Sequence, residues 1–280
     1  MTCARRLGAI GGFIILMWGF VLPNAAAQSL FDLRGATHST ALGHATTART
    51  ELPGIHGNPA GWAPMENPSI TLYAGQSYGL PELQHGTISI HWPFSVGHAA
   101  AGVGTFGTEA YRETYLSVGA ARTLHLGSSR PLHLGTTVRY YHVAMSRFGN
   151  AAAVGIHAGM VMQIMPLVDV GVHATNINQP QWTDETPLPR TLSVGLAYRL
   201  TDRVTMSADL FNDVEFPMRF RSGIEATVIA PLTVYGGVQT TPSEFALGGR
   251  IGWKGIYVGV AAEQHWELGW SPAADLRITW

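Results

Sequence analysis

Apolar and polar residues alternate one by one along most of the chain from about residue 112 to the end. Such a period of two is typical of β-strands with one apolar and one polar face. One segment alternates apolar positions with polar or small ones, and these apolar positions are Leu116, Val118, Ala120, Leu124 and Leu126. The sign of the pattern stays constant, so the segments predict a single antiparallel sheet.

Fourteen such segments can be counted. They are centred near residues 72, 88, 101, 117, 137, 157, 171, 195, 207, 223, 235, 249, 259 and 276. An even number is typical of bacterial single-chain membrane barrels. Twelve strands is the alternative, because the first three segments alternate least clearly.

Composition favours a membrane barrel over a soluble β-sandwich. Only 12% of the residues are charged, against about 25% in soluble domains, and the outward face is Leu, Val, Ile and Met. No segment after the N-terminus has 18 consecutive apolar residues, so a membrane would be crossed by strands. We therefore predict an all-β, transmembrane antiparallel barrel in the bacterial outer membrane, with outer-membrane lipid as a partner.

The connections alternate in length. The long ones lie near residues 77–82, 107–112, 146–150, 178–189, 212–217, 241–244 and 265–272. The intervening turns are short, near residues 93–95, 127–130, 165–166, 201–202, 230–231 and 254–255. Since such barrels have long extracellular loops and short periplasmic turns, residues 178–189 are predicted to be the longest extracellular loop.

The N-terminal residues fall into two segments. Arg5 and Arg6 precede the apolar run 7–22 and the small residues 25–27, which predicts a signal peptide at 1–27. Residues 28–66 neither alternate nor carry an apolar stripe, so we predict a hatch inside a barrel formed by 67–280. Cys3, the only cysteine, lies in the predicted signal peptide, which leaves the mature chain without thiol chemistry.

The hatch contains the motif Asn58-Pro59-Ala60-Gly61. We expect the Asn58 amide to bind backbone groups of the barrel and Pro59 to fix a turn. Many inward positions are glycine, which makes room for a hatch or for an open channel; they are Gly119, Gly135, Gly155, Gly159, Gly171, Gly195, Gly223, Gly237, Gly248, Gly252 and Gly259.

The third segment, 96–106, is mostly alanine and glycine and does not alternate cleanly. Gly97, Gly102 and Gly104 permit bulges, which interrupt the pairing of strands. We expect a lateral opening to lipid at this strand. The alternative is a regular strand with small side chains.

The chain resembles the PorV/PorQ family of outer-membrane proteins, which are related to the FadL long-chain fatty-acid transporters. The resemblance is carried by residues 34–36, the Gly43 region, Asn58 to Gly61 and residues 242–269. It departs from the family pattern at residues 37–39 and at His44. The resemblance implies passage or binding of a hydrophobic small molecule through the hatch and a lateral opening. The alternatives are a secretion-system component that binds protein clients, and a structural protein.

Other chemistry has little support in the sequence. The twelve histidines include His125, His133, His157 and His173 on the polar face, but no metal-ligand or nucleophile motif accompanies them. We expect no enzyme activity, no cofactor and no metal. A net charge of −1 gives no case for nucleic acid. The lumenal charges are expected to pair with one another and with the hatch.

Overall fold

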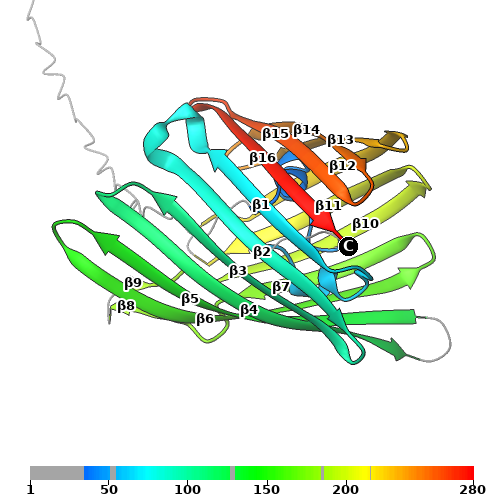
Figure 1. Ribbon diagram of the computed structural model, residues 1–280, viewed down its shortest axis with the longest axis horizontal. Helices are drawn as coiled ribbons and strands as arrows, with labels where there is room; N and C mark the ends of the chain where they lie inside the picture. The colour runs from blue at the N-terminus through cyan, green and yellow to red at the C-terminus, as the bar shows by residue number, and fades with distance from the viewer. Residues whose placement is uncertain (1–34, 51–54, 127–129, 184–185, 215) are drawn as a thin grey trace, which may run out of the picture.

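The computed structural model describes residues 35–50, 55–126, 130–183, 186–214 and 216–280. Fourteen antiparallel strands close into a barrel, in which β1 pairs with both β2 and β16 (Figure 1). The strands of the barrel are β1 (Ser69–Gln76), β2 (Gln84–Phe94), β3 (Gly97–Gly107), β4 (Tyr111–Leu126), β5 (Arg130–Met145), β6 (Gly149–Met165), β7 (Val168–Thr175), β10 (Thr191–Thr201), β11 (Val204–Asp213), β12 (Arg219–Ile229), β13 (Leu232–Gln239), β14 (Glu244–Trp253), β15 (Ile256–His265) and β16 (Gly269–Thr279). The predicted strand count is confirmed, and the alternative of twelve strands is wrong.

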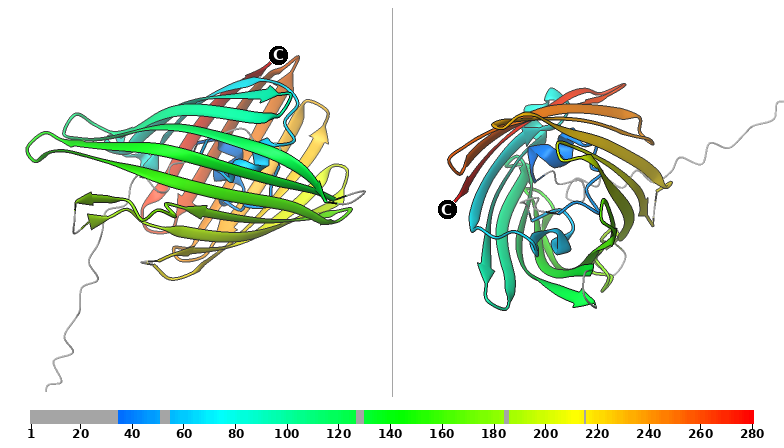
Figure 2. Two further views of the ribbon diagram at one scale, coloured as in Figure 1. Left: turned by 90° about the horizontal axis from the view of Figure 1, so that it is seen from below. Right: turned by 90° about the vertical axis from the view of Figure 1, so that its right-hand side faces the viewer.

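The two faces of the barrel follow the alternation of the sequence. On β4, Tyr115 is fully buried in the lumen, whereas its neighbour Leu116 is 54% exposed on the outside. The same alternation of buried and exposed positions runs along β2 and β10. An apolar band therefore surrounds the barrel, and polar and small residues face the lumen. The right-hand view of Figure 2 shows the strands arranged around the blue N-terminal segment.

The connections differ between the two ends of the barrel. At the end that we call the short-turn end, they are turns such as 95–96, 166–167 and 202–203. At the long-loop end, residues 176–190 form the longest connection, as predicted. That connection is not a plain loop, because β8 (Gln181–Thr183) pairs with β9 (Thr186–Pro187) in a small hairpin.

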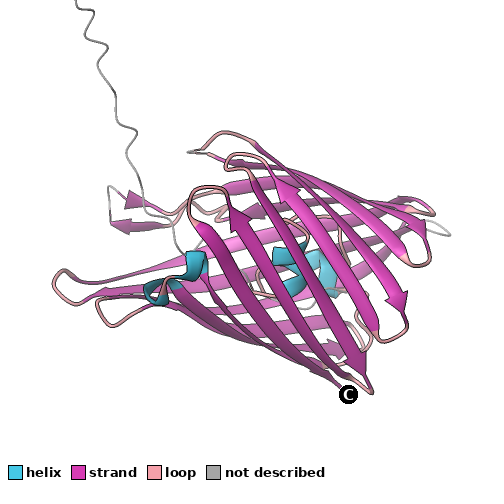
Figure 3. Ribbon diagram, turned by 90° about the horizontal axis from the view of Figure 1, so that it is seen from above, coloured by secondary structure: helices cyan, strands magenta, loops and turns pink. Residues whose placement is uncertain are grey.

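The described part of the hatch, residues 35–50 and 55–66, lies inside the barrel. It contains α1 (Thr37–Ala41) and the 3-10 helix η1 (Pro59–Trp62), and Figure 3 shows both enclosed by the strands. Two further 3-10 turns, η2 (Ser77–Gly79) and η3 (Pro81–Leu83), connect β1 to β2. Among the described residues, no helix has the length and apolar character to cross a membrane. The predicted signal peptide and residues 28–34 lie outside the described residues.

The third strand corrects one prediction. β3 pairs with β2 from Gly97 to Phe106 and with β4 from His98 to Gly107, without a register shift on either side. The predicted interruption at Gly97, Gly102 and Gly104 is therefore wrong. Gly102 and Gly104 instead make room in the lumen, since an added Cβ would meet Ile55 at the first and the ring of Tyr115 at the second.

Candidate functional site: the hatch in the lumen

A belt of inward glycines forms the seat of the hatch. A Cβ added to any of them would lie within 3.1 Å of a hatch atom. The belt comprises Gly102, Gly119, Gly135, Gly159, Gly171, Gly195, Gly223, Gly237, Gly248 and Gly259, one on each of ten strands. Of the other two predicted inward glycines, Gly155 faces Asn176 and Gly252 faces Tyr257. The glycines thus make room for the hatch, which fills the space that an open channel would need.

The front half of the hatch, residues 35–50, is fastened by wall carboxylates. Asp275 accepts bonds from the backbone N–H and the hydroxyl of Thr37, both at 2.7 Å. Asp209 accepts the backbone N–H of Thr47 at 2.9 Å. Hydrogen bonds to a charged acceptor are the stronger kind, so these two carboxylates fix both ends of the front half to the wall.

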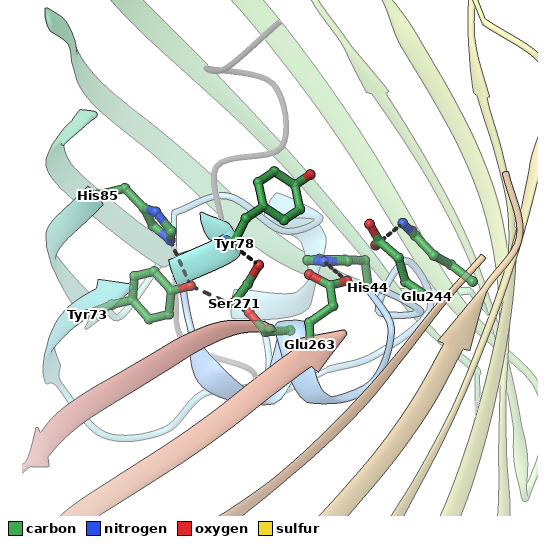
Figure 4. A network of polar contacts seen from close by, with 9 residues as sticks. His44, Tyr73, Tyr78, His85, Glu244, Glu263 and Ser271 are labelled. Carbon is green, nitrogen blue, oxygen red and sulfur yellow. Dashed lines mark hydrogen bonds and ion pairs between the residues drawn. The ribbon is translucent and has the colours of Figure 1, made fainter. Parts of the chain in front are cut away.

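An ion pair and a contact between a histidine and a carboxyl group add to this attachment. Arg49 is paired with Glu225 of β12, and His44 lies 3.3 Å from Glu263 of β15. Figure 4 shows the His44 and Glu263 side chains pointing toward each other. The front half also packs Leu42 against Gly223 of the wall. Its attachment therefore combines charges with close backbone contact.

The rear half, residues 55–66, is fastened by the predicted motif. The Asn58 amide nitrogen donates to the carbonyls of Met160 on β6 and Val172 on β7 and to that of Thr47 in the front half. Its side-chain oxygen accepts the backbone N–H of Ala60 and so caps η1. Asn58 therefore joins the two halves of the hatch and the wall.

The other motif residues fit into close spaces. Pro59 and Ala60 lie against Gly135, where a Cβ on the wall would collide with their backbone. Gly61 lies against the Arg49 carbonyl, which a Cβ at this position would approach to 2.8 Å. Pro at the first position of η1 has a backbone already suited to the turn. The motif thus sets the path of the rear half.

Trp62 anchors the rear half by apolar packing. Its side chain is buried, and it belongs to a cluster on the β3–β6 side of the lumen. The members are Ile55, Trp62, Ala63, Met65, Ala100, Phe106, Tyr115, Ala121, Tyr141, Ala153 and Leu188. Leu188 comes from the connection 176–190, and Trp182 of β8 packs edge-on against Tyr141 at 6.3 Å. We call Trp182 and Leu188 the cap pair, because they cover the cluster from the long-loop end.

Lumenal tyrosines and histidines complete the contacts. The Tyr73 hydroxyl lies 3.2 Å from His85 and 3.5 Å from the Thr40 hydroxyl of α1, which links β1 and β2 to the hatch. Figure 4 shows Tyr73 and His85 turned toward each other. Tyr115 contacts His56 of the rear half. The lumen is thus filled with specific polar contacts.

Two hatch histidines are held as neutral groups. Burial, with added repulsion from Arg250, Arg277 and Arg49, holds the pKa of His38 well below its usual range. Burial, with added repulsion from Arg139, His157 and His85, does the same to the pKa of His56. A charge on either ring would lose hydration, so both are neutral at pH 7.

A polar cavity of about 120 Å³ remains between the two halves of the hatch and the wall. His38, His44 and Arg49 line it from the hatch, and His173 and Arg221 line it from the barrel. Among the described residues, no group of three or more His, Cys, Asp or Glu side chains has metal-binding geometry. This cavity is therefore polar and small.

Known structures share this architecture. No protein-family model and no curated protein matches the chain. The CymD monoaromatic hydrocarbon channel superposes with a TM-score of 0.60 at 12% identity, over 88% of this chain and 96% of that chain. The Pseudomonas putida toluene transporter TodX gives 0.56 at 13% over 89% and 97%, and a Pseudomonas aeruginosa FadL homologue gives 0.58 at 9% over 88% and 98%. The chain has the FadL-type barrel fold.

The aromatic residues of the outer loops lie differently from one another. Trp182 faces the lumen as part of the cap pair. Trp270 instead packs against Phe245 on the outward face, and Trp266 is 86% exposed. Of these three tryptophans, Trp182 is therefore the one that faces the lumen. Trp62 is not among the site residues predicted from the sequence, although its position directly after the motif Asn58 to Gly61 could have drawn attention to it.

Proposed function

We propose that the protein is an outer-membrane channel for a hydrophobic small molecule, and that the hatch controls passage. The observation that carries the proposal is the hatch seated on the glycine belt, with an apolar cluster covering it from the long-loop end. An open porin would leave the lumen filled with water. The fold shared with the hydrocarbon channel CymD and the toluene transporter TodX supports this class of substrate.

The cap pair supplies the first apolar surface for such a molecule. Trp182 and Leu188 cover Tyr141, and Ile55 of the hatch belongs to the same cluster. Beyond Ile55 the cavities are polar and small, of about 120 Å³ and 40 Å³. A hydrophobic molecule therefore requires the hatch to shift before it can pass.

A reversible cross-link between hatch and wall tests this requirement. The Thr47 hydroxyl donates to the Ser193 hydroxyl of β10 at 3.0 Å, so Thr47→Cys with Ser193→Cys places two thiols within reach of each other. Oxidation should abolish uptake of radiolabelled toluene by cells carrying the protein in the outer membrane. Reduction with dithiothreitol should restore it.

The matched control joins wall to wall. Thr175 and Thr191 lie 2.8 Å apart at their hydroxyls on neighbouring strands, so a cysteine pair there leaves the hatch free. Oxidation of this control should leave toluene uptake unchanged. Equal uptake by the oxidised and reduced hatch pair would contradict hatch-controlled passage.

A second candidate function is a component of a secretion system that binds protein clients. Phe148 and Trp266 favour it, because both lie at the long-loop end and are 87% and 86% exposed. Exposed aromatics of this kind are enriched in protein interfaces. In that case toluene uptake would be absent in the wild type as well, and Phe148→Ser with Trp266→Ser would abolish secretion of the clients.

A further inference from the structure

A row of small residues crosses the outward face of five adjacent strands. Ala74 pairs with Ala274 on one side and with Gly86 on the other. Gly86 pairs with Thr105, which pairs with Thr114. With neighbouring strands about 4.8 Å apart, the row is about 19 Å long.

A row of large apolar residues runs beside it, nearer the short-turn end. Leu72 lies between Leu276 and Ile88, and Ile88 pairs with Val103. The small row lies lower than this ridge, and together they form a groove of about 560 Å³. Leu72 and Ile88 are 40% and 49% exposed on the same outward face. The groove is therefore continuous with the apolar band.

The groove is polar at one end only. Over β16, β1 and β2 the outward-facing side chains of its lining are Ala, Gly, Leu and Ile, whereas on β3 and β4 the outward Thr105 and Thr114 lie beside Val103. Arg112 follows on the outward face of β4, two residues before Thr114, and is exposed. The adjacent Glu113 is buried on the lumenal face and bound by the Tyr111 hydroxyl. His142 of β5, a further titratable group, lies opposite Thr114.

We propose that this groove binds one anionic lipid of the surrounding bilayer. An acyl chain lies along the small-residue row, and the headgroup lies at Arg112 and the two threonines. An unfilled groove against a lipid-facing wall would forfeit dispersion contacts, which an acyl chain restores. Arg112 supplies the charge that distinguishes an anionic from a zwitterionic headgroup. The inference is independent of the proposed passage of small molecules.

Native mass spectrometry of the purified barrel with added phosphatidylglycerol and phosphatidylcholine tests the site. The wild type should retain one phosphatidylglycerol in preference to phosphatidylcholine. Gly86→Leu fills the groove, and a Cβ there meets only the Tyr73 carbonyl at 3.6 Å, so the wall tolerates it. Retention by this variant should fall about tenfold, since several methylene contacts are lost.

The matched control is Gly249→Leu on the outward face of β14. Its Cβ likewise meets only one carbonyl, that of Thr233 at 3.6 Å, and it lies outside the groove. This control should retain lipid as the wild type does. Arg112→Gln should still bind the acyl chain, but its preference for phosphatidylglycerol over phosphatidylcholine should fall about threefold. Arg130→Gln, at the short-turn end, should keep the full preference.

Several outcomes would overturn the proposal. Equal retention by the wild type and Gly86→Leu would remove the groove as the binding site. A wild type that retains no lipid would do the same. A dimer lost in Gly86→Leu would show that a second copy of the chain occupies the groove, and an unchanged lipid preference in Arg112→Gln would remove the headgroup assignment.

Discussion

The two halves of the hatch are held in the same barrel by different physical means. The front half is bound by carboxyl side chains of the wall, among them Asp275 and Asp209. The rear half is bound mainly by the neutral Asn58 amide and by the buried Trp62, and one charged wall group, Arg139, donates to the Ile55 carbonyl at 2.9 Å. Both halves rest on the same belt of glycines.

The difference indicates which half can be released by conditions in solution. Charge-assisted bonds depend on salt and on protonation, whereas apolar packing depends on neither to the same degree. The rear half also leads directly into β1, and just before that strand the Pro68 carbonyl accepts the backbone N–H of Trp280. We therefore expect the front half to be the part that moves, with the rear half as its fixed end.

The largest effect should come from Trp62→Ala. The side chain is 1% exposed, so its removal leaves a cavity and should destabilise the seated hatch by about 3–5 kcal/mol. Hydrogen exchange of residues 55–66 should report this loss while the strands stay protected. Trp266→Ala removes an exposed indole and serves as the control. Equal protection of 55–66 in both variants would contradict the packing role.

Asp275→Asn should have a smaller effect, confined to the front half. Loss of the charged acceptor for both Thr37 donors should cost about 1–3 kcal/mol. Exchange should rise in residues 35–50 and stay constant in 55–66. Asp202→Asn, in the exposed turn after β10, is the control. Faster exchange in the rear half as well would show that the halves do not move separately.

The smallest effect is that of pH. His38 and His56 have a lowered pKa in the seated hatch, so the released hatch binds more protons as pH falls. Seating is then most stable above the ordinary histidine pKa of about 6.5 and weakens as pH falls through that value. Exchange of the hatch measured against pH should show this slope. His56→Gln should reduce it, and an unchanged slope would exclude that residue as the source.

Composition and the lengths of the connections predicted the membrane barrel, and alternation predicted the strands and their two faces, because the inward and outward positions of a strand differ in the solvent they meet. It also predicted lumenal pairing of charges, seen between Arg199 and Asp169 and between Arg49 and Glu225. The glycine positions predicted room without saying what fills it. Only the three-dimensional structure shows that the hatch fills this room, because contacting residues such as Gly135 and Ala60 are far apart in sequence.

The wrong prediction for β3 has a clear physical cause. Small residues permit a bulge but do not impose one, and the ladders to β2 and β4 satisfy every backbone group that a bulge would leave unpaired. The glycines at 102 and 104 are required by Ile55 and Tyr115 on the lumenal side. Composition alone could not tell a glycine that permits a bulge from a glycine that makes room for a lumenal side chain.

The belt also constrains the order in which the protein is built. α1 touches β13 to β16, and η1 touches β4 to β6, so the hatch contacts strands from both sides of the β1–β16 seam. The hatch precedes every strand in the chain, and a finished wall would leave it no route inward past the tyrosines and the cap pair. We therefore expect the hatch to act as a core around which the sheet curls, with the seam closing last over a segment already in place.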